Sequence, residues 1–443
     1  MGTISLGLLL HFYQPPGQLS GVLRRIVNES YRPLLRVFRT HANAHASFNI
    51  NGVLTEMLDD HGYGDVTAGL AELAESGRVE ITGSGKYHPI LPLIAPDEAV
   101  RQIAINDEAN RRLLGPAYRP RGFFPPEMAW DHTLASAVAA SGKDWVVVSG
   151  IACPIDWPVD RVCREEAATA DEPSHPPRQS AAPTAAAAAD GSIAVLFRDD
   201  IQSNRIAFRT VDADGFFDDL RRMSADGRDR YVVIAMDAET FGHHIPGWEE
   251  EFLAKLFRLL AAQPFATTPR TAISAAAPRP VTVRSMTLSE VVDSVPAGEM
   301  VTPRASSWST TRDDLDHGSP YPLWRHRGNE LHRLLWRHLE QAMDLFGLAR
   351  AYAGPDGNQD MSVARAFADL ALHSDQFWWA SRRPHWSVNL VHRGLNMQRD
   401  LILNAVRALN AGDAPEDVLR RAQERVAIAR DLADRITDRL FWD

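Results

Sequence analysis

The sequence predicts an α/β protein, in which an incomplete (β/α)7 TIM-like barrel is followed by a C-terminal α-helical bundle. Over the first two thirds of the 443 residues, short apolar runs alternate with helical patterns, which is typical of βα units around a parallel sheet. Several runs are apolar on both faces, as expected for strands covered by helices outside and by a packed interior. The last third repeats apolar residues at the 3.6-residue period of helices that pack together.

Seven apolar runs account for the barrel, and turn residues or helical patterns separate them. The expected strands are residues 4–12, 46–51, 79–85, 122–127, 144–150, 193–199 and 231–237. We therefore expect a barrel domain over residues 1–300 and a helical domain over residues 301–443. One segment interrupts the barrel: residues 164–191 are rich in Ala, Pro and polar residues without apolar periodicity, which predicts a flexible surface insertion.

Composition excludes several classes of protein. The chain has 47 Lys+Arg against 57 Asp+Glu and no basic run, so a nucleic-acid partner is not expected. No stretch approaches the ~20 apolar residues that cross a bilayer, and the first residues lack the features of a signal peptide. Cys153 and Cys163 are too few for a disulfide framework and lack the spacing of a structural zinc site. We expect a cytoplasmic protein with free thiols and no membrane partner.

Polar and ionisable residues recur at the carboxyl ends of the expected strands. In a parallel barrel these ends open on one face, so side chains far apart in the sequence converge there. A single residue of this kind is more often a solvated loop residue or a structural histidine, but the coincidence at five strands indicates a site. The residues are His11, Gln14, Asn49, Asn51, His88, Glu127, Asp237 and Glu239.

Two strand ends carry carboxylic acids. Glu127, in "GFFPPEMAW", follows two prolines among apolar neighbours, where a lone carboxylate is unfavourable unless it is paired or functional. Its alternative is a surface glutamate that caps the next helix. In "MDAETFGHH" (236–244), Asp237 and Glu239 point the same way because side chains alternate along a strand. Two opposed carboxyl groups on a concave face are the groups that cleave glycosidic bonds. The residues alone do not choose between Asp237 and Glu239.

Two alternatives use the same residues. One is a zinc-dependent enzyme of the deacetylase or α-mannosidase kind, since imidazoles and carboxylates are zinc ligands. Its candidate ligands are His11, His88, His243, His244, Asp237 and Glu239. The adjacent pair His243 and His244 does not readily bind one ion from a regular backbone, so we expect no metal and no cofactor. The other alternative is a non-catalytic carbohydrate-binding protein on the same scaffold.

Tryptophan residues favour a sugar site, because flat indole rings stack on the apolar faces of sugars. Several of the 11 fall in loops or at helix ends near the expected barrel mouth, and core positions are the alternative for about half of them. The candidates are Trp130, Trp248, Trp308, Trp324, Trp378, Trp379 and Trp386.

The motifs, in their order along the chain, resemble those of glycoside hydrolase family 57. "HFYQP" (11–15), "GSGKYHPILPL" (83–93), "GFFPPEMAW" (122–130) and "MDAETFGHH" (236–244) resemble the first four regions of that family. "SDQFWWASRRPHW" (374–386), in the helical part, resembles the fifth. The family's incomplete (β/α)7 barrel and helical bundle agree with the fold expected from periodicity.

The resemblance implies a retaining glycoside hydrolase or transglycosylase that acts on an α-glucan by double displacement, of the amylase or 4-α-glucanotransferase type. It implies Glu127 as the nucleophile and Asp237 as the acid/base, with the helical domain completing the active-site cleft. No cofactor is expected. Together with the strand-end and tryptophan residues above, the candidate substrate-binding residues are His11, Gln14, Asn51, His88, Trp130, Glu239, His243, His244, Trp308, Asp375, Trp378 and Trp379.

Overall fold

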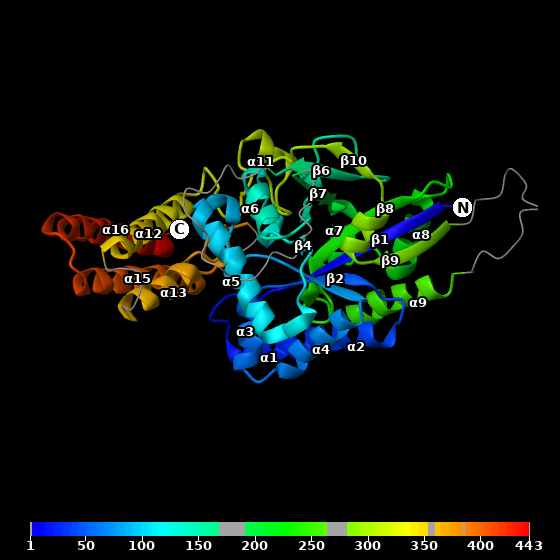
Figure 1. The fold of residues 1–443 in the computed structure, drawn as a ribbon, viewed down its shortest axis with the longest axis horizontal. Helices are drawn as coiled ribbons and strands as arrows, with labels where there is room; N and C mark the ends of the chain where they lie inside the picture. The colour runs from blue at the N-terminus through cyan, green and yellow to red at the C-terminus, as the bar shows by residue number, and fades with distance from the viewer. Residues whose placement is uncertain (1, 168–190, 264–280, 353–358, 384–385, 443) are drawn as a thin grey trace, which may run out of the picture. The chain divides into compact units, whose positions relative to one another are not determined.

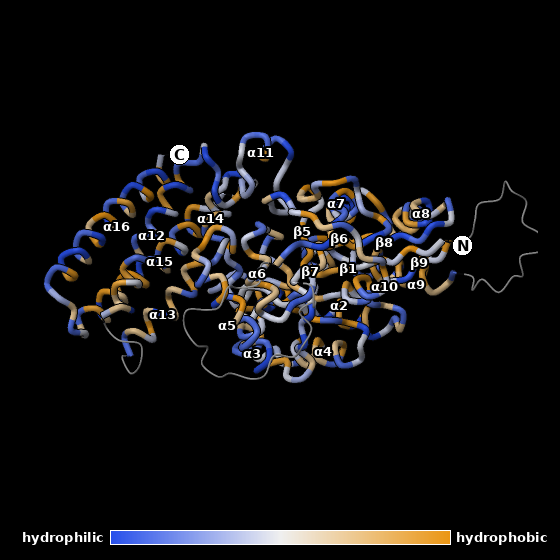
Figure 2. The backbone as a smooth tube through the Cα atoms, turned by 45° about the horizontal axis from the view of Figure 1, so that its top comes forward, coloured by the Kyte–Doolittle hydropathy of each residue, from blue (hydrophilic) through white to orange (hydrophobic). Residues whose placement is uncertain are grey.

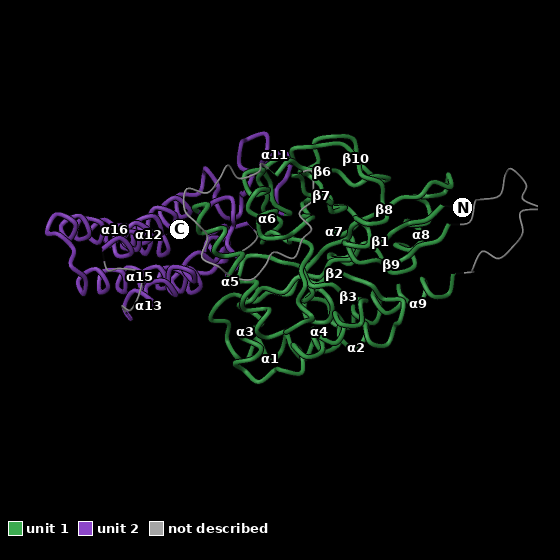
Figure 3. The backbone as a smooth tube through the Cα atoms, viewed as in Figure 1, with its two compact units in different colours: residues 1–86, 95–308 green, residues 87–94, 309–443 purple. Residues whose placement is uncertain are grey.

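Figure 1 shows the fold of the chain in a computed structural model. The structure describes residues 2–167, 191–263, 281–352, 359–383 and 386–442. The chain divides into two compact units, which Figure 3 colours separately. Unit 1 consists of Met1–Lys86 and Ala95–Trp308, and unit 2 of Tyr87–Ile94 and Ser309–Asp443. The division therefore follows Trp308 rather than residue 300, and a short segment of the barrel sequence belongs to unit 2.

Seven parallel strands among the described residues form the centre of unit 1, and each of them falls on an expected strand. They are β1 (Gly2–Phe12), β2 (Ala46–Ile50), β3 (Val79–Thr82), β4 (Gly122–Phe123), β5 (Trp145–Val148), β7 (Ser192–Phe197) and β8 (Arg230–Asp237). Parallel pairs join β3 to β2, β2 to β1 and β1 to β8, and also β4 to β5 and β5 to β7. Isolated parallel bridges from Gly83 to Phe123 and from Arg198 to Val233 connect the two sheets, so the seven strands lie in a ring that is only partly closed.

Three strands that the sequence analysis missed are added at the two places where the ring is least closed. β9 (Val281–Met286) pairs with the first half of β1, which leaves only residues 9–12 of β1 to pair with β2. β6 (Val162–Glu166) runs antiparallel to β7, and β10 (Ala297–Met300) pairs with β6. The barrel is therefore incomplete.

β6 also corrects the start of the expected flexible insertion at 164–191. Residues 164–166 are strand and pair with the beginning of β7. The part of the expected insertion at 168–190 lies outside the described residues.

Helices cover the outside of the barrel. They are α1 (Ser20–Ile26), α2 (Arg32–Thr40), α3 (Gly52–Asp60), α4 (Gly64–Glu75), α5 (Pro96–Leu114), α6 (Ala135–Ala140), α7 (Asp200–Ala207), α8 (Ala213–Met223), α9 (Lys255–Ala261) and α10 (Leu288–Ser294). The even-numbered residues of β1 from Ile4 to Phe12 are buried in one large apolar cluster with side chains of α2, α4 and α9. Leu9, Leu196 and Ala235 belong to a second cluster, which fills the barrel interior. Because side chains alternate along a strand, odd-numbered residues of β1 and β8 and even-numbered residues of β7 face inward.

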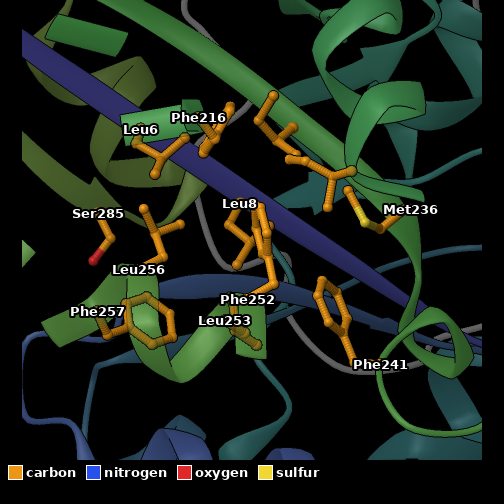
Figure 4. A pocket seen from close by; sticks show the side chains of 12 residues that line it. Leu6, Leu8, Phe216, Met236, Phe241, Phe252, Leu253, Leu256, Phe257 and Ser285 are labelled. Atoms are coloured by element: carbon orange, nitrogen blue, oxygen red, sulfur yellow. The ribbon is translucent and has the colours of Figure 1, made fainter. Parts of the chain in front are cut away.

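The outer core contains one small cavity on the helix-covered side of β1 and β8. Figure 4 shows its lining of apolar side chains, among them Leu8, Met236, Phe241 and Phe252. Its volume is about 10 Å³, which has room for one water molecule at most. This cavity is a packing space and not a ligand site.

Unit 2 is helical. Its helices are α11 (Arg312–Asp316), α12 (Glu330–Tyr352), α13 (Gln359–Ala371), α14 (Asp375–Trp378), α15 (Val388–Ala411) and α16 (Glu416–Trp442). α15 packs against α12 and α13, and α16 packs against α12. Figure 2 shows hydrophobic and hydrophilic residues alternating along α12, α15 and α16, as expected for a bundle. Among the described residues, no helix combines the length and the apolar character that crossing a membrane requires.

Candidate active site

The candidate site lies where the inward-facing residues of the barrel strands change from apolar to polar. At the carboxyl end of β1, His11 is level with Asn49 of β2 and with Asp237 of β8. Nδ1 of His11 lies 2.6 Å from Oδ1 of Asn49, and Nδ2 of Asn49 donates to Oγ1 of Thr82 at 3.0 Å. Because the amide oxygen can only accept, Nδ1 of His11 carries the proton. The strand ends therefore form a hydrogen-bonded polar row across β1, β2 and β3.

Glu127 lies in a strained turn after β4. Its φ of 59° and ψ of 18° are in the left-handed region, which is uncommon for residues other than glycine and is often found at functional sites. The backbone N–H of Trp308 donates to the carbonyl oxygen of Glu127 at 3.1 Å. The indole Nε1–H of Trp308 donates to Oε2 of Glu127 at 2.7 Å. This donor stabilises a negative charge on the Glu127 carboxyl group.

Aromatic rings connect this turn to the end of β1. The His11 ring stacks on Phe124 with ring centres 4.6 Å apart. The rings of Trp308 and His11 lie in an edge-to-face arrangement, with ring centres 6.0 Å apart and planes at 73°. Trp308 is half-buried, so part of its ring is accessible at the mouth. His11 and Trp308, both expected in the substrate site, are thus brought together beside Glu127.

The structure buries Trp130, one of the candidate substrate contacts. Its side chain is 0% exposed, and its Nε1–H donates to Oε2 of Glu165 at 3.0 Å. The backbone of Trp130 pairs with Ser306, and this pairing directs the ring into the core. Burial raises the pKa of Glu165 to about 7, and the Trp130 donor offsets part of the shift.

Asp237 is the last residue of β8 and faces the barrel mouth. Its carboxyl group is half-buried and has no hydrogen-bond partner among the described residues. Burial raises its pKa to about 6, and the positive charge of Arg198 partly opposes the shift. The group therefore keeps a proton in weakly acidic solution, as a general acid requires.

Arg198 connects the surroundings of the two acids, and the sequence analysis did not single it out. It follows β7 at an inward-facing position and is 4% exposed. Its Nε–H donates to the carbonyl oxygen of Ala235 at 2.8 Å. Its guanidinium carbon lies 5.8 Å from the centre of the Trp308 ring, and its charge acts on Asp237. The signal in the sequence is an arginine that continues the inward-facing pattern of an apolar strand.

Glu239 and Gln14 form a buried pair next to Asp237. Glu239 is 4% exposed and Gln14 is 7% exposed. Oε1 of Glu239 accepts a hydrogen bond from Nε2 of Gln14 at 3.0 Å and another from the Tyr31 hydroxyl. Burial, together with the charge of Asp237, raises the pKa of Glu239 to about 8. Both residues were expected in the site, whereas Tyr31 was missed because a tyrosine within a helical pattern carries no local signal.

The structure also buries Asn51, another candidate substrate contact. It is 0% exposed, and its Nδ2 group donates to Gly85 O at 2.6 Å and to Ser84 Oγ at 3.2 Å. Both amide hydrogens are therefore used to hold the loop after β3.

The two adjacent histidines after β8 have different surroundings. Nδ1 of His243 lies 2.6 Å from Oε2 of Glu29. His244 is exposed, and its backbone N–H donates to the carbonyl oxygen of Glu239 at 2.8 Å.

Four of the expected site residues lie in unit 2. His88 is 1% exposed, and its Nδ1 lies 3.0 Å from Oγ of Ser374, although 286 residues separate the two. Ser374 immediately precedes α14, which carries Asp375 and the half-buried Trp378. Trp379 follows and is 4% exposed. The second and fifth motifs therefore meet within unit 2.

The described residues contain no group of three or more His, Cys, Asp or Glu side chains arranged to hold a metal ion. The histidines that were candidate ligands contact other residues: His11 bonds to Asn49, His88 to Ser374 and His243 to Glu29.

Comparisons with known proteins bear on this geometry. The sequence matches glycosyl hydrolase family 57 over residues 13–290, more than half of the chain. An alpha-amylase of Pyrococcus horikoshii is 29% identical over 141 residues, which cover 31% of this chain and 21% of that protein. A 4-alpha-glucanotransferase of Thermococcus kodakarensis is 29% identical over 139 residues, with the same coverage of 31% and 21%. The matched region spans about a fifth of the length of these curated relatives.

A solved structure has the same fold over nearly the whole chain. The GH57-type branching enzyme from Pyrococcus horikoshii superposes with a TM-score of 0.67 and 16% identity, covering 97% of this chain and 95% of that one. At this identity the likeness concerns the fold alone, and it confirms the predicted incomplete (β/α)7 barrel with a helical C-terminal region. Since the family match extends over more than half of the sequence, the chain belongs to glycosyl hydrolase family 57.

Proposed function

We propose that the protein is a retaining glycoside hydrolase or transglycosylase that acts on α-glucans by double displacement, of the amylase or 4-α-glucanotransferase type. The observation that carries this proposal is that Glu127 and Asp237 each interact with one member of the pair formed by Trp308 and Arg198. Glu127 accepts a hydrogen bond from Trp308. Arg198 lies over the Trp308 ring, and its positive charge lowers the pKa of Asp237. Family membership and the names of the relatives support the class of substrate.

In the first step, Asp237 gives its proton to the glycosidic oxygen while an oxygen of Glu127 attacks the anomeric carbon. The bond to the leaving sugar breaks, and a covalent glycosyl–enzyme ester forms on Glu127. In the second step, the ionised Asp237 takes a proton from water or from the hydroxyl group of an acceptor sugar. The oxygen of that molecule attacks the anomeric carbon and releases Glu127, so two inversions give net retention.

The two environments suit these roles. An N–H donor at 2.7 Å favours the charged form of Glu127, which is the nucleophilic form. Asp237 has no such donor among the described residues, and burial raises its pKa to about 6, which favours the protonated form. We propose His11 and Trp308 as the residues that contact the sugar beside the two acids, because their rings lie together at the barrel mouth.

The test is incubation of the full-length protein with maltoheptaose, followed by chromatography of the products and NMR spectroscopy of the anomer released first. A hydrolase gives shorter maltooligosaccharides, a transferase gives both shorter and longer chains, and either should release the α-anomer first. If neither maltoheptaose nor soluble starch changed during the incubation, this result would contradict the proposed activity. Initial release of the β-anomer would contradict the double-displacement mechanism.

A further inference from the structure

Arg198 directly follows β7 and carries a buried positive charge at the barrel mouth. Its side chain is 4% exposed, and each of its three nitrogen atoms donates a hydrogen bond. Nε donates to the carbonyl oxygen of Ala235 at 2.8 Å, Nη1 to Oδ1 of Asp200 at 2.7 Å and Nη2 to Oδ1 of Asn204 at 3.0 Å. Because a guanidinium group is planar and rigid, these three acceptors fix both its position and the direction of its plane.

The carboxylate of Asp200 is held in turn by the end of β5. Its Oδ2 accepts a hydrogen bond from Oγ of Ser149 at 2.9 Å and another from the backbone N–H of Ile151 at 3.0 Å. A Cβ atom at Gly150 would lie 2.5 Å from the carbonyl oxygen of Arg198 and 2.9 Å from Oδ2 of Asp200, so this close approach requires glycine. The main anchor of the Arg198 side chain is therefore fixed from a separate strand.

The guanidinium group lies over the ring of Trp308, with its central carbon 5.8 Å from the ring centre. The same ring is half-buried and donates its Nε1–H to Oε2 of Glu127 at 2.7 Å. Phe124 and His11 adjoin the ring with their planes at 70° and 73° to it. A cation is attracted to the face of an indole ring, so the fixed guanidinium group favours one orientation of the Trp308 ring.

We infer that Arg198 is a positioning residue for the proposed nucleophile, because it holds the Trp308 ring in the orientation in which the indole N–H reaches Glu127. The inference rests on the proposed function. A hydrogen bond weakens steeply when the donor turns away from its acceptor, so a ring that rotates loses Glu127 without leaving the mouth. Since Arg198 is buried, its effect on the reaction is exerted through Trp308.

The test compares Arg198→Lys with the matched control Arg205→Lys. Lysine keeps the positive charge beside Asp200 and lacks the planar fork that reaches three acceptors. Arg205, on α7, donates to Oδ2 of Asp219 at 2.6 Å and to Oε1 of Gln202 at 3.0 Å. The control therefore removes the same kind of fork from the contact between α7 and α8.

The first readout does not depend on activity. It is the proton–nitrogen NMR spectrum of the full-length protein with ¹⁵N-labelled indole groups, in which the Trp308 signal is the one that Trp308→Phe removes. An indole proton bonded to a carboxylate resonates downfield, and Glu127→Gln shows the direction in which its signal moves when the charged acceptor is lost. In Arg198→Lys the signal should move the same way and its proton should exchange with water roughly tenfold faster. Arg205→Lys should leave it unchanged.

An unchanged Trp308 signal in Arg198→Lys would overturn the inference. If the signal moves as expected but the wild type does not act on α-glucans, the positioning of Trp308 by Arg198 is supported and the proposed function fails. The two failures are thus distinguishable.

The second readout is a double-mutant cycle on maltoheptaose. In Arg198→Lys, kcat should fall by about tenfold, while KM changes by less than about threefold. Because Arg198 acts through Trp308, adding Arg198→Lys to Trp308→Phe should lower kcat by less than about twofold more. Arg205→Lys should be fully active. Losses that multiply in the double variant would overturn the inference, because they are expected from structural support that does not involve Trp308.

Asn204→Ala keeps the inference testable if Arg198→Lys does not fold. Asn204 is exposed on α7, and its replacement removes one of the three acceptors while Arg198 itself remains. The Trp308 signal should move in the same direction by a smaller amount, and kcat should fall about two- to threefold. If neither the signal nor kcat changed in Asn204→Ala, this result would contradict the inference.

Discussion

The two acids at the barrel mouth are held in contrasting ways. Glu127 lies in a left-handed turn and accepts the indole N–H of Trp308 at 2.7 Å. Asp237 ends a regular strand, has no hydrogen-bond donor among the described residues, and has a pKa raised to about 6 by burial. The first environment favours a charge and the second favours a proton. The proposed function uses this difference: the group that favours the charge is the nucleophile, and the group that favours the proton is the acid.

The strongest test of this contrast is Glu127→Gln, which keeps the shape of the side chain and removes the nucleophile. We expect kcat on maltoheptaose to fall by on the order of 10⁶-fold, as for other covalent nucleophiles. Circular dichroism and the unfolding midpoint should be close to those of the wild type. Glu250→Gln, at an exposed position of the same unit, is the control and should be fully active. Retained turnover in Glu127→Gln would remove this residue from the reaction.

Asp237→Ala should have a smaller effect that depends on the substrate. Loss of a general acid lowers the rate on maltoheptaose by roughly 10²–10⁴-fold. An aryl glycoside whose leaving group needs no proton should form the glycosyl–enzyme at a rate much closer to that of the wild type. The wild type should lose activity as the pH rises above about 6, because the Asp237 pKa is about 6 and its protonated form is the acid. This limb should be absent in Asp237→Ala on the activated substrate.

Equal losses on both substrates would contradict the assignment of Asp237 as the acid. Added azide offers a further check, because a small anion can attack the glycosyl–enzyme without help from a base. It should restore turnover of the activated substrate by Asp237→Ala and leave Glu127→Gln inactive.

Trp308→Phe should affect Glu127 and not Asp237, because it removes the N–H donor to Glu127 and keeps an aromatic ring. A hydrogen bond to a charged group contributes about 1.5–3 kcal/mol, so kcat should fall by roughly 10- to 100-fold. The basic limb that reports Asp237 should stay in place. Trp442→Phe, at a position that is 88% exposed in unit 2, is the control and should leave both the rate and the pH profile unchanged.

The barrel strands could be predicted because each is an apolar run between turn residues. β6, β9 and β10 could not be predicted in this way. β6 places Arg164 and Glu165 in a strand, and β10 is mostly exposed, so hydropathy gives no strand signal for either. Pairing with strands distant in the sequence, which a local pattern does not contain, makes these segments extended.

The strand-end acids could be predicted because the carboxyl ends of parallel strands meet at one face. The direction of Trp130 could not be predicted, since left-handed conformations at Glu127 and Met128 break the alternation on which such a prediction depends. Tyr31 was missed for a related reason. The π-helical turn at Val27–Tyr31, which directs it towards Glu239, lies within a helical pattern and has no sequence signature of its own.

The smallest expected effect concerns Glu165, another buried carboxyl group with a raised pKa. Its replacement tests whether a raised pKa is by itself enough to identify a catalytic acid. Glu165 is 2% exposed, and burial raises its pKa to about 7. The wild type should lose stability as the pH rises from about 4.5 to about 7, because the folded state binds this proton more tightly than the unfolded state. Glu165→Gln has no such proton to lose. Between about pH 4.5 and about pH 8, the free energy of unfolding measured with urea should therefore rise by up to about 3 kcal/mol in the variant relative to the wild type. Its kcat/KM should stay at the wild-type value, since Glu165 contacts Trp130 in the core. If Glu165→Gln were stable but inactive, Glu165 would be an essential acid in addition to Glu127 and Asp237.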